Sequence, residues 1–282
     1  MKTTVHGSDG VGLVVSDEGL PNGCPIIFIH GWSQSSLSWK YQFKSDLAEK
    51  YRLITYDLRG HGMSEKPNND EAYINAIHWA DDLLAIIQKL NLIDVILVGW
   101  SFGGYVICDY LRRHGESNLK GINFVSWAVM LGDSEKERAL TGDGFNRFFG
   151  GSISRELTES ITAMRGFVRA CAEKEISAED FEEVLAYNMM TPPDVRRAVA
   201  SRGELDNTPL LEELTIPVLI TQGTSDQVTK RTAASHIHKA CRNSKESIYE
   251  GTGHLPFIED AKRYNAELDE FANLVFGKGG PR

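Results

Sequence analysis

Three residues that lie far apart in the chain carry the side chains that covalent acyl-transfer chemistry needs. Ser101 lies within residues 99–104 (GWSFGG), Asp226 follows the run PVLITQG, and His254 lies in GTGHLP. A serine hydroxyl becomes a good nucleophile only when a base removes its proton, and that base must be oriented by a carboxylate. We therefore predict that Ser101 is a nucleophile, that His254 is its general base and acid, and that Asp226 orients His254.

The serine lies where a predicted strand passes directly into a predicted helix. The apolar run over residues 94–100 (DVILVGW) precedes it, and the helical pattern YVICDYLRR follows. A serine on such a sharp turn needs small neighbours, which explains the spacing G-x-S-x-G. The alternative is a serine that only caps the helix. The turn favours the first interpretation, because it lifts the hydroxyl above the edge of the sheet.

Acyl transfer also needs hydrogen-bond donors for the oxyanion that forms on the substrate carbonyl. Residues 30–33 (HGWS) follow the apolar run PIIFI, and the glycine at position 31 lets the chain turn so that the next amide faces the site. We predict the backbone amides of Trp32 and Phe102 as the oxyanion donors. His30 is expected to brace this loop, and residues 57–62 (DLRGHG) are expected to be structural, with a place for His61 near the rim of the site as the alternative.

The elements that must position these residues alternate between strand and helix. Short apolar runs rich in β-branched residues are nearly continuous, as in strands covered on both faces, and they span residues 25–31, 52–58, 94–100, 121–127 and 217–223. Stretches with helical spacing lie between them, as at 74–90 and 102–113. This pattern predicts an α/β fold with a mainly parallel sheet, with the site at the carboxyl ends of its strands. Residues 3–15 alternate in polarity and predict an antiparallel hairpin at the edge.

The strand pattern stops between residues 128 and 211, where helical spacing and aromatic side chains dominate. We predict a core domain of residues 1–127 and 212–282 and a helical cap, or lid, of residues 128–211 inserted over one end of the sheet. Most apolar side chains of the cap should pack it onto the core. The predicted substrate pocket is lined by apolar side chains, namely Trp32, Trp100, Trp127, Phe145, Phe149 and Met189.

Composition and charge exclude several classes of partner. The chain of 282 residues has 30 Lys and Arg against 39 Asp and Glu, a net charge of −9, and no basic block for nucleic acid. No apolar run reaches the ~20 residues of a membrane span, and the first residues lack a signal-like apolar segment, so we expect a cytoplasmic protein. Four dispersed cysteines, and histidines without ligand spacing, predict no metal site. Phosphate-binding loop motifs are lacking, so no cofactor is expected.

Five motifs in order carry a resemblance to a known family. HGW, DLRGHGMS, GWSFGG, QGTSDQV and GTGHLPFIE, between about residues 23 and 272, resemble the α/β-hydrolase superfamily, and within it the small esterases and the cofactor-free haloperoxidases or perhydrolases. The resemblance implies a mostly parallel eight-stranded sheet, the triad of Ser101, Asp226 and His254, and the oxyanion amides named above. It argues against haloalkane dehalogenases and epoxide hydrolases, which need a carboxylate where this chain has serine.

We therefore predict a serine hydrolase that acts on small carboxylic esters, with an apolar or aromatic small molecule as its substrate. Two alternatives stay open. One is a cofactor-independent dioxygenase or lyase on the same fold, in which His254 removes a proton from the substrate and no acyl-enzyme forms. The other is a ligand-binding receptor with slow turnover. The sequence leaves the natural substrate and homo-oligomer formation undetermined.

Overall fold

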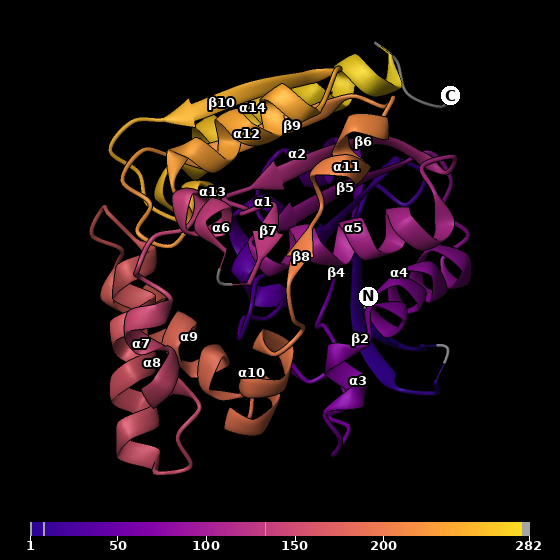
Figure 1. Cartoon of the computed structure of the whole chain (residues 1–282). Coiled ribbons are helices and arrows are strands. Elements are labelled where there is room, and N and C mark those ends of the chain that lie inside the picture. Colours follow the sequence, from indigo (N-terminus) through magenta and orange to yellow (C-terminus); the bar gives the residue numbers. More distant parts are fainter. Residues whose placement is uncertain (1, 8, 133, 278–282) are drawn as a thin grey trace.

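A twisted eight-stranded sheet forms the centre of the computed structural model, which describes residues 2–7, 9–132 and 134–277 (Figure 1). The strand order is β1-β2-β4-β3-β5-β6-β9-β10, in which β2 pairs antiparallel with β1 and β4 and the other neighbouring strands pair in parallel. The strands are β1 (Lys2–His6), β2 (Gly12–Gly19), β3 (Cys24–Ile29), β4 (Tyr51–Tyr56), β5 (Val95–Trp100), β6 (Leu119–Val125), β9 (Val218–Gly223) and β10 (Ser244–Tyr249). The predicted α/β sheet and its antiparallel edge hairpin are confirmed.

Helices connect the parallel strands and cover both faces of the sheet (Figure 1). Helices α4, α5 and α12 lie on one face, and α2 and α14 lie on the other. The core helices are α1 (Lys40–Phe43), α2 (Leu47–Lys50), α3 (Glu71–Ile74), α4 (Ala76–Lys89), α5 (Phe102–His114), α11 (Thr208–Glu213), α12 (Arg231–Ala240), α13 (Pro256–Glu259) and α14 (Ala261–Phe276), with a short 3₁₀ helix, η1 (Ser36–Trp39).

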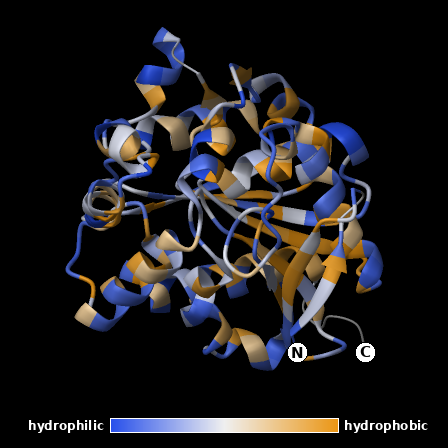
Figure 2. Cartoon of the chain, turned by 90° about the horizontal axis from the view of Figure 1, so that it is seen from below, coloured by the Kyte–Doolittle hydropathy of each residue, from blue (hydrophilic) through white to orange (hydrophobic). Residues whose placement is uncertain are grey.

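The central strands are buried along their whole length because helices cover them on both sides. Every residue of β5 (VILVGW) and of β9 (VLITQG) is buried, which is why their sequences are mainly apolar and do not alternate, with Thr221 and Gln222 as polar residues near the end of β9. Figure 2 shows the same division, with hydrophobic colouring on the strands and hydrophilic colouring on the outer surfaces of the helices. Among the described residues, no helix combines the length and the apolar character needed to cross a membrane.

The chain between β6 and β9 forms most of its helices beyond the carboxyl ends of the strands (Figure 1). These helices are α6 (Glu135–Leu140), α7 (Asn146–Ser152), α8 (Leu157–Cys171), α9 (Ala178–Met189) and α10 (Pro193–Ala200). This segment also holds a two-stranded ribbon of β7 (Met130–Leu131) and β8 (Leu205–Asp206), which the sequence did not predict because two-residue strands leave no periodic pattern. The predicted cap boundary at residue 211 falls inside α11, and the domain division stays a prediction.

Two buried histidines brace the loops that follow β3 and β4. The imidazoles of His30 and His61 have ring centroids 5.2 Å apart, and both side chains are fully buried. The amide of Leu58 donates to Nε2 of His30 at 3.0 Å, so the His30 proton lies on Nδ1, which donates to the Gly31 carbonyl at 2.8 Å. Nδ1 of His61 lies 2.9 Å from the Arg59 carbonyl. The contacts of His30 join the loop after β4 to the start of the predicted oxyanion loop.

Burial keeps both imidazoles neutral. Desolvation lowers the pKa of His30 from 6.5 to about 4, and desolvation together with the neighbouring His30 lowers the pKa of His61 from 6.5 to about 3. Between about pH 6.5 and pH 3 the unfolded chain therefore binds a proton at position 61 that the folded chain does not. The stabilisation from this site is fully present above pH 6.5 and is lost as the pH falls.

We predict that the difference in unfolding free energy between wild type and His61→Asn depends on pH. Asparagine keeps a donor for the Arg59 carbonyl but does not titrate, so the difference should shrink by about 1.4 kcal/mol per pH unit between pH 6 and pH 4. Urea denaturation over this range measures it. His238→Asn, which removes an exposed imidazole, is the matched control. If the unfolding free energies of wild type and His61→Asn change in parallel with pH, the claim that burial lowers the pKa of His61 is contradicted.

Candidate active site

Ser101 lies on a strained turn between β5 and α5. Its backbone angles are φ 51° and ψ −116°, a conformation that a residue with a side chain rarely adopts. The turn is held because the Ser101 amide donates to the Val125 carbonyl at 2.9 Å and the Gly104 amide donates to the Ser101 carbonyl at 2.9 Å. The predicted strand-to-helix turn is present, and it presents the serine at the carboxyl end of the sheet.

The turn also needs a glycine where α5 passes the end of β3. A Cβ placed on Gly103 would lie 2.4 Å from the Ile29 carbonyl oxygen and 3.2 Å from that of His30. This close approach brings the first turn of α5 against the start of the loop that carries Trp32. The two predicted oxyanion amides, those of Trp32 and Phe102, therefore lie on backbone segments that are packed directly against each other.

His254 and Asp226 form a buried hydrogen-bonded pair. Nδ1 of His254 lies 2.8 Å from Oδ2 of Asp226, and the two side chains are 2% and 0% exposed. The carboxylate also accepts hydrogen bonds from Gln222 Nε2 at 2.9 Å and from the amides of Val228 and Thr229 at 2.8 and 2.9 Å. These donors hold the carboxylate so that His254 Nδ1 carries a proton toward it and Nε2 is left for the cavity.

The loop that carries His254 is fixed from the core and from the cap. The His254 amide donates to the Cys171 carbonyl at the end of α8 at 2.7 Å, and the indole of Trp100 donates to the His254 carbonyl at 3.0 Å. The Glu259 carboxylate accepts from the Gly253 amide at 2.9 Å and from two amides just after α8. Burial raises the pKa of Glu259. His254 is thus held through its backbone as well as through Asp226.

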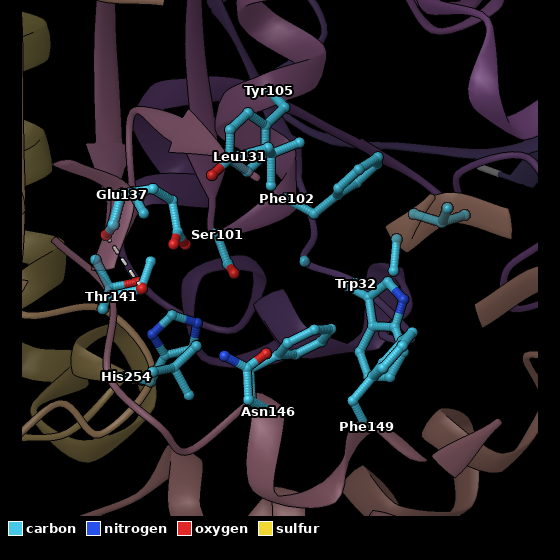
Figure 3. A pocket seen from close by; sticks show the side chains of 18 of the residues that line it. Trp32, Ser101, Phe102, Tyr105, Leu131, Glu137, Thr141, Asn146, Phe149 and His254 are labelled. Carbon is cyan, nitrogen blue, oxygen red and sulfur yellow. Dashed lines mark hydrogen bonds between the residues drawn. The ribbon is translucent and has the colours of Figure 1, made fainter. Parts of the chain in front are cut away.

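Ser101 and His254 line the same cavity. The cavity has a volume of about 570 Å³ and lies between the carboxyl end of the sheet and the helices that follow β6. Figure 3 shows the Ser101 hydroxyl and the His254 imidazole directed toward one another at one side of it. Trp32 lies across the cavity and packs against three cap rings, those of Phe145, Phe149 and Phe167, at centroid distances of 4.9, 6.2 and 5.5 Å.

Most of the predicted pocket residues line this cavity, and two do not. Trp32, Trp100, Phe145 and Phe149 lie on its wall. Trp127 lies behind α5, where its ring stacks on Phe124 at 4.4 Å and a Cβ at Gly104 would lie within 2.5 Å of it.

Met189 lies between the cap helices, with its sulfur 3.6 Å from Nη2 of Arg196. The prediction that Trp127 and Met189 line the pocket is therefore corrected, because both side chains fill packing space outside it. The Phe102 side chain, whose aromatic character also favours an apolar pocket, lines the cavity as well.

The sequence analysis missed polar residues of the cavity wall. Glu137 on α6 and Asn146 on α7 both line it, and Figure 3 shows their side chains directed inward, with the Glu137 carboxylate toward Ser101. Glu137 lies in the charged stretch SEKER, which is typical of a solvent-facing helix. No signal in the sequence distinguishes its inward orientation, since that depends on how α6 packs.

The described residues (2–7, 9–132 and 134–277) contain no group of three or more His, Cys, Asp or Glu side chains arranged to hold a metal ion. The cavity walls combine aromatic and aliphatic side chains with polar ones, which include Gln34, Asn146, Ser201 and the carboxylates of Glu137 and Glu204. Apolar walls with placed polar groups are the usual make-up of a site for a small organic molecule.

Comparison with known proteins gives one consistent family. A family model described as the alpha/beta hydrolase fold matches residues 25–261. The non-heme chloroperoxidase CPO-A1 of Kitasatospora aureofaciens is 30% identical over 94% of this chain and 97% of its own length. The esterase RhEst1 of Rhodococcus sp. ECU1013 superposes with a TM-score of 0.91 at 34% identity, covering 97% of this chain and 99% of that one. The esterase EaEST of Exiguobacterium antarcticum superposes with a TM-score of 0.86 at 26% identity, covering 96% and 99%.

We predict that Gly103→Ala destabilises the protein. The added methyl group meets a backbone carbonyl at 2.4 Å, which cannot move without shifting β3, and overpacking of this kind costs roughly 1–3 kcal/mol. Gly150→Ala is the matched control, because a Cβ added to Gly150 in α7 would have no atom within 4 Å, and this variant should gain up to about 1 kcal/mol. Chemical denaturation measures the unfolding free energy of both variants. If Gly103→Ala and Gly150→Ala are equally stable, the close approach at Gly103 is contradicted.

Proposed function

The chain belongs to the α/β-hydrolase family, and on this premise we propose that it hydrolyses small carboxylic esters through an acyl-enzyme on Ser101. It is an enzyme of the hydrolase class, whose relatives are esterases and haloperoxidases. The observation that carries the proposal is the buried His254–Asp226 hydrogen bond of 2.8 Å beside a serine on a strained turn at the same cavity.

The first step forms the acyl-enzyme. Oγ of Ser101 attacks the ester carbonyl carbon, its proton passes to Nε2 of His254, and the carbonyl electron pair moves onto the oxygen. The resulting imidazolium is stabilised by the Asp226 carboxylate, to which it is hydrogen bonded. The amides of Trp32 and Phe102 would donate to the oxyanion, and the Phe102 amide suits this role because it opens α5 and has no partner within that helix.

Collapse of the tetrahedral intermediate breaks the bond to the leaving alcohol, which takes the proton from His254. A water molecule then attacks the acyl-serine ester while His254 removes one of its protons, and the second collapse returns the proton to Ser101 and releases the acid. His254 therefore acts twice as a base and twice as an acid, which requires that its ring stay fixed. The contacts of its backbone with Trp100 and Cys171 supply that restraint.

The cavity supports a small, partly apolar ester as the substrate class. A volume of about 570 Å³ lies within the range of pockets for small organic ligands. The ring cluster formed by Trp32, Phe145, Phe149 and Phe167 offers an apolar surface for an acyl or aryl group on the cap side. Polar atoms gather on the other side, near Ser101.

We predict that Ser101→Ala lowers kcat on nitrophenyl esters by about 10⁴-fold or more, because the covalent step loses its nucleophile. A fluorophosphonate should label wild type at Ser101 and leave the variant unlabelled. Ser126→Ala is the matched control, since Ser126 directly follows the neighbouring strand β6 with a similar φ of 46° but lies outside the cavity wall. The control should stay within about threefold of wild type.

Other results would point to the other chemistries open for this fold. Undiminished ester turnover in Ser101→Ala would remove the acyl-enzyme from the mechanism. Consumption of a substrate that depends on His254 but not on Ser101 would favour a dioxygenase or lyase. Tight ligand binding without steady-state turnover would favour a receptor.

Glu137 gives the polar side of the cavity a negative charge. Figure 3 shows its carboxylate directed toward Ser101, and its charge helps to raise the pKa of the buried Tyr105, after desolvation. A carboxylate beside the reacting centre repels a substrate that carries its own carboxylate. We therefore expect neutral esters to be preferred over anionic ones.

We predict that Glu137→Gln raises the ratio of kcat/KM for an anionic ester over a neutral ester by about tenfold, because one like charge is removed. A nitrophenyl hemiglutarate and a nitrophenyl butyrate form a suitable pair. Glu135→Gln, an exposed position on the same helix, should leave this ratio unchanged. An unchanged ratio in Glu137→Gln would show that its charge does not act on the substrate.

A further inference from the structure

A fully buried arginine lies in the cap beside the predicted oxyanion loop. Arg196 on α10 is 0% exposed. Its guanidinium donates to two serine hydroxyls, Oγ of Ser33 and Oγ of Ser160, both at 3.0 Å. It also donates to two backbone carbonyls, those of Ser152 at 2.8 Å and Asn188 at 2.9 Å. Each of these acceptors is neutral. Burial lowers the pKa of Arg196 to about 10. Burying such a charge is costly unless its donors are satisfied.

The arginine joins the cap helices to one another. Ser152 ends α7, Ser160 lies in α8 and Asn188 lies in α9, so one side chain on α10 connects all the helices of the cap that follow α6. The planar guanidinium can serve acceptors that lie in several directions at once, which a lysine ammonium on a flexible stem does less well. The network also extends beyond these helices, to Ser33 in the loop after β3.

The same residue holds the loop that carries Trp32 from two sides. The indole of Trp32 donates to the backbone carbonyl of Arg196 at 3.0 Å, and the side chain of Arg196 donates to Ser33. Oγ of Ser33 in turn donates to the Asn188 carbonyl at 3.1 Å. The side-chain amides of Gln34 and Asn188 exchange two hydrogen bonds, at 3.2 and 3.1 Å.

Ser33 has a backbone conformation that needs such support. Its φ of 59° lies in the left-handed region, which a residue with a side chain adopts only when its surroundings stabilise it. Ser33 is joined to Trp32 by a peptide bond, so fixing Ser33 limits how far the Trp32 backbone, and with it the Trp32 amide, can move. Release of Ser33 would let the loop relax and move that amide away from the position where the oxyanion forms.

We propose that Arg196 is a positioning residue for the oxyanion loop, which fixes the Trp32 amide through Ser33 and through the Trp32 indole. The inference rests on the proposed ester hydrolysis and assigns to the cap a second task besides enclosing the substrate. The cap supplies the contacts that preorganise one of the two oxyanion donors. Arg196 itself does not touch the substrate.

The test compares Arg196→Met with Arg197→Met on a neutral nitrophenyl ester. Arg197 is the next residue of the same helix, its side chain is 42% exposed, and among the described residues its guanidinium pairs only with Asp70 at the surface. Arg196→Met should lower kcat by about 10²-fold with KM changed less than threefold, because misplacing an oxyanion donor affects the transition state more than the bound ester. Arg197→Met should keep both constants.

Two further measurements separate positioning from a purely structural role. The affinity for a boronic acid that forms a tetrahedral adduct with serine should fall in Arg196→Met by the same factor as kcat/KM. Arg196→Lys, which restores a charge and some donors, should recover part of the lost kcat. A loss of thermal stability with kcat and boronate affinity preserved in the folded fraction would overturn the proposal.

Ser33→Ala provides a test that does not require the buried arginine to be replaced. It removes the hydroxyl that Arg196 contacts and should lower kcat by about 10-fold with KM nearly unchanged. If Arg196→Met does not fold, this variant decides, and a kcat within threefold of wild type overturns the inference. Failure of the proposed function and failure of this inference give different results. The proposed function fails if ester turnover does not depend on Ser101. The inference fails if turnover depends on Ser101 but is unchanged in the Arg196 and Ser33 variants.

Discussion

A hydrogen bond of 2.8 Å between Nδ1 of His254 and the buried Asp226 carboxylate determines which ring nitrogen of the histidine reaches the cavity. Asp226 can do this because two backbone amides and the Gln222 side chain hold its oxygens at the same time. A carboxylate with its other acceptor positions occupied cannot rotate away from the imidazole. The roles proposed for Ser101 and for the oxyanion amides depend on this orientation.

The rest of the fold brings three strand ends together around that pair. Strands β5, β9 and β10 end at the same edge of the sheet, and the residues that follow them supply Ser101, Asp226 and His254. The strand ends are rigid because the strands are buried on both faces, and α5 starts in direct contact with the end of β3. Helices α7 to α10 lie beyond these strand ends, and Arg196 and Asn188 join them to the loop that carries Trp32. Under the proposed mechanism, the sheet and these helices would together place donors and acceptors around one substrate carbonyl.

The sequence was sufficient where local chemistry determines the structure. The continuous apolar run before Ser101 and the glycines around it predicted the strand, the turn and the helix, and the later apolar runs predicted that Asp226 and His254 lie in loops after strands. The sequence was insufficient where the position of a side chain depends on which face of a helix packs against the core. Trp127 has the residue type of a pocket wall but packs behind α5, and Glu137 has the context of a solvent-facing residue but points into the cavity. Arg196 and Arg197 are neighbours of one type, and only the packing of four cap helices distinguishes the buried one.

The most direct measurement is a crystal structure of the protein after reaction with a nitrophenyl alkylphosphonate. We expect a covalent bond from phosphorus to Oγ of Ser101, Nε2 of His254 within hydrogen-bonding distance of that oxygen, and the phosphonyl oxygen about 3 Å from the amides of Trp32 and Phe102. An adduct on another residue, or a phosphonyl oxygen directed away from both amides, would contradict the proposed mechanism.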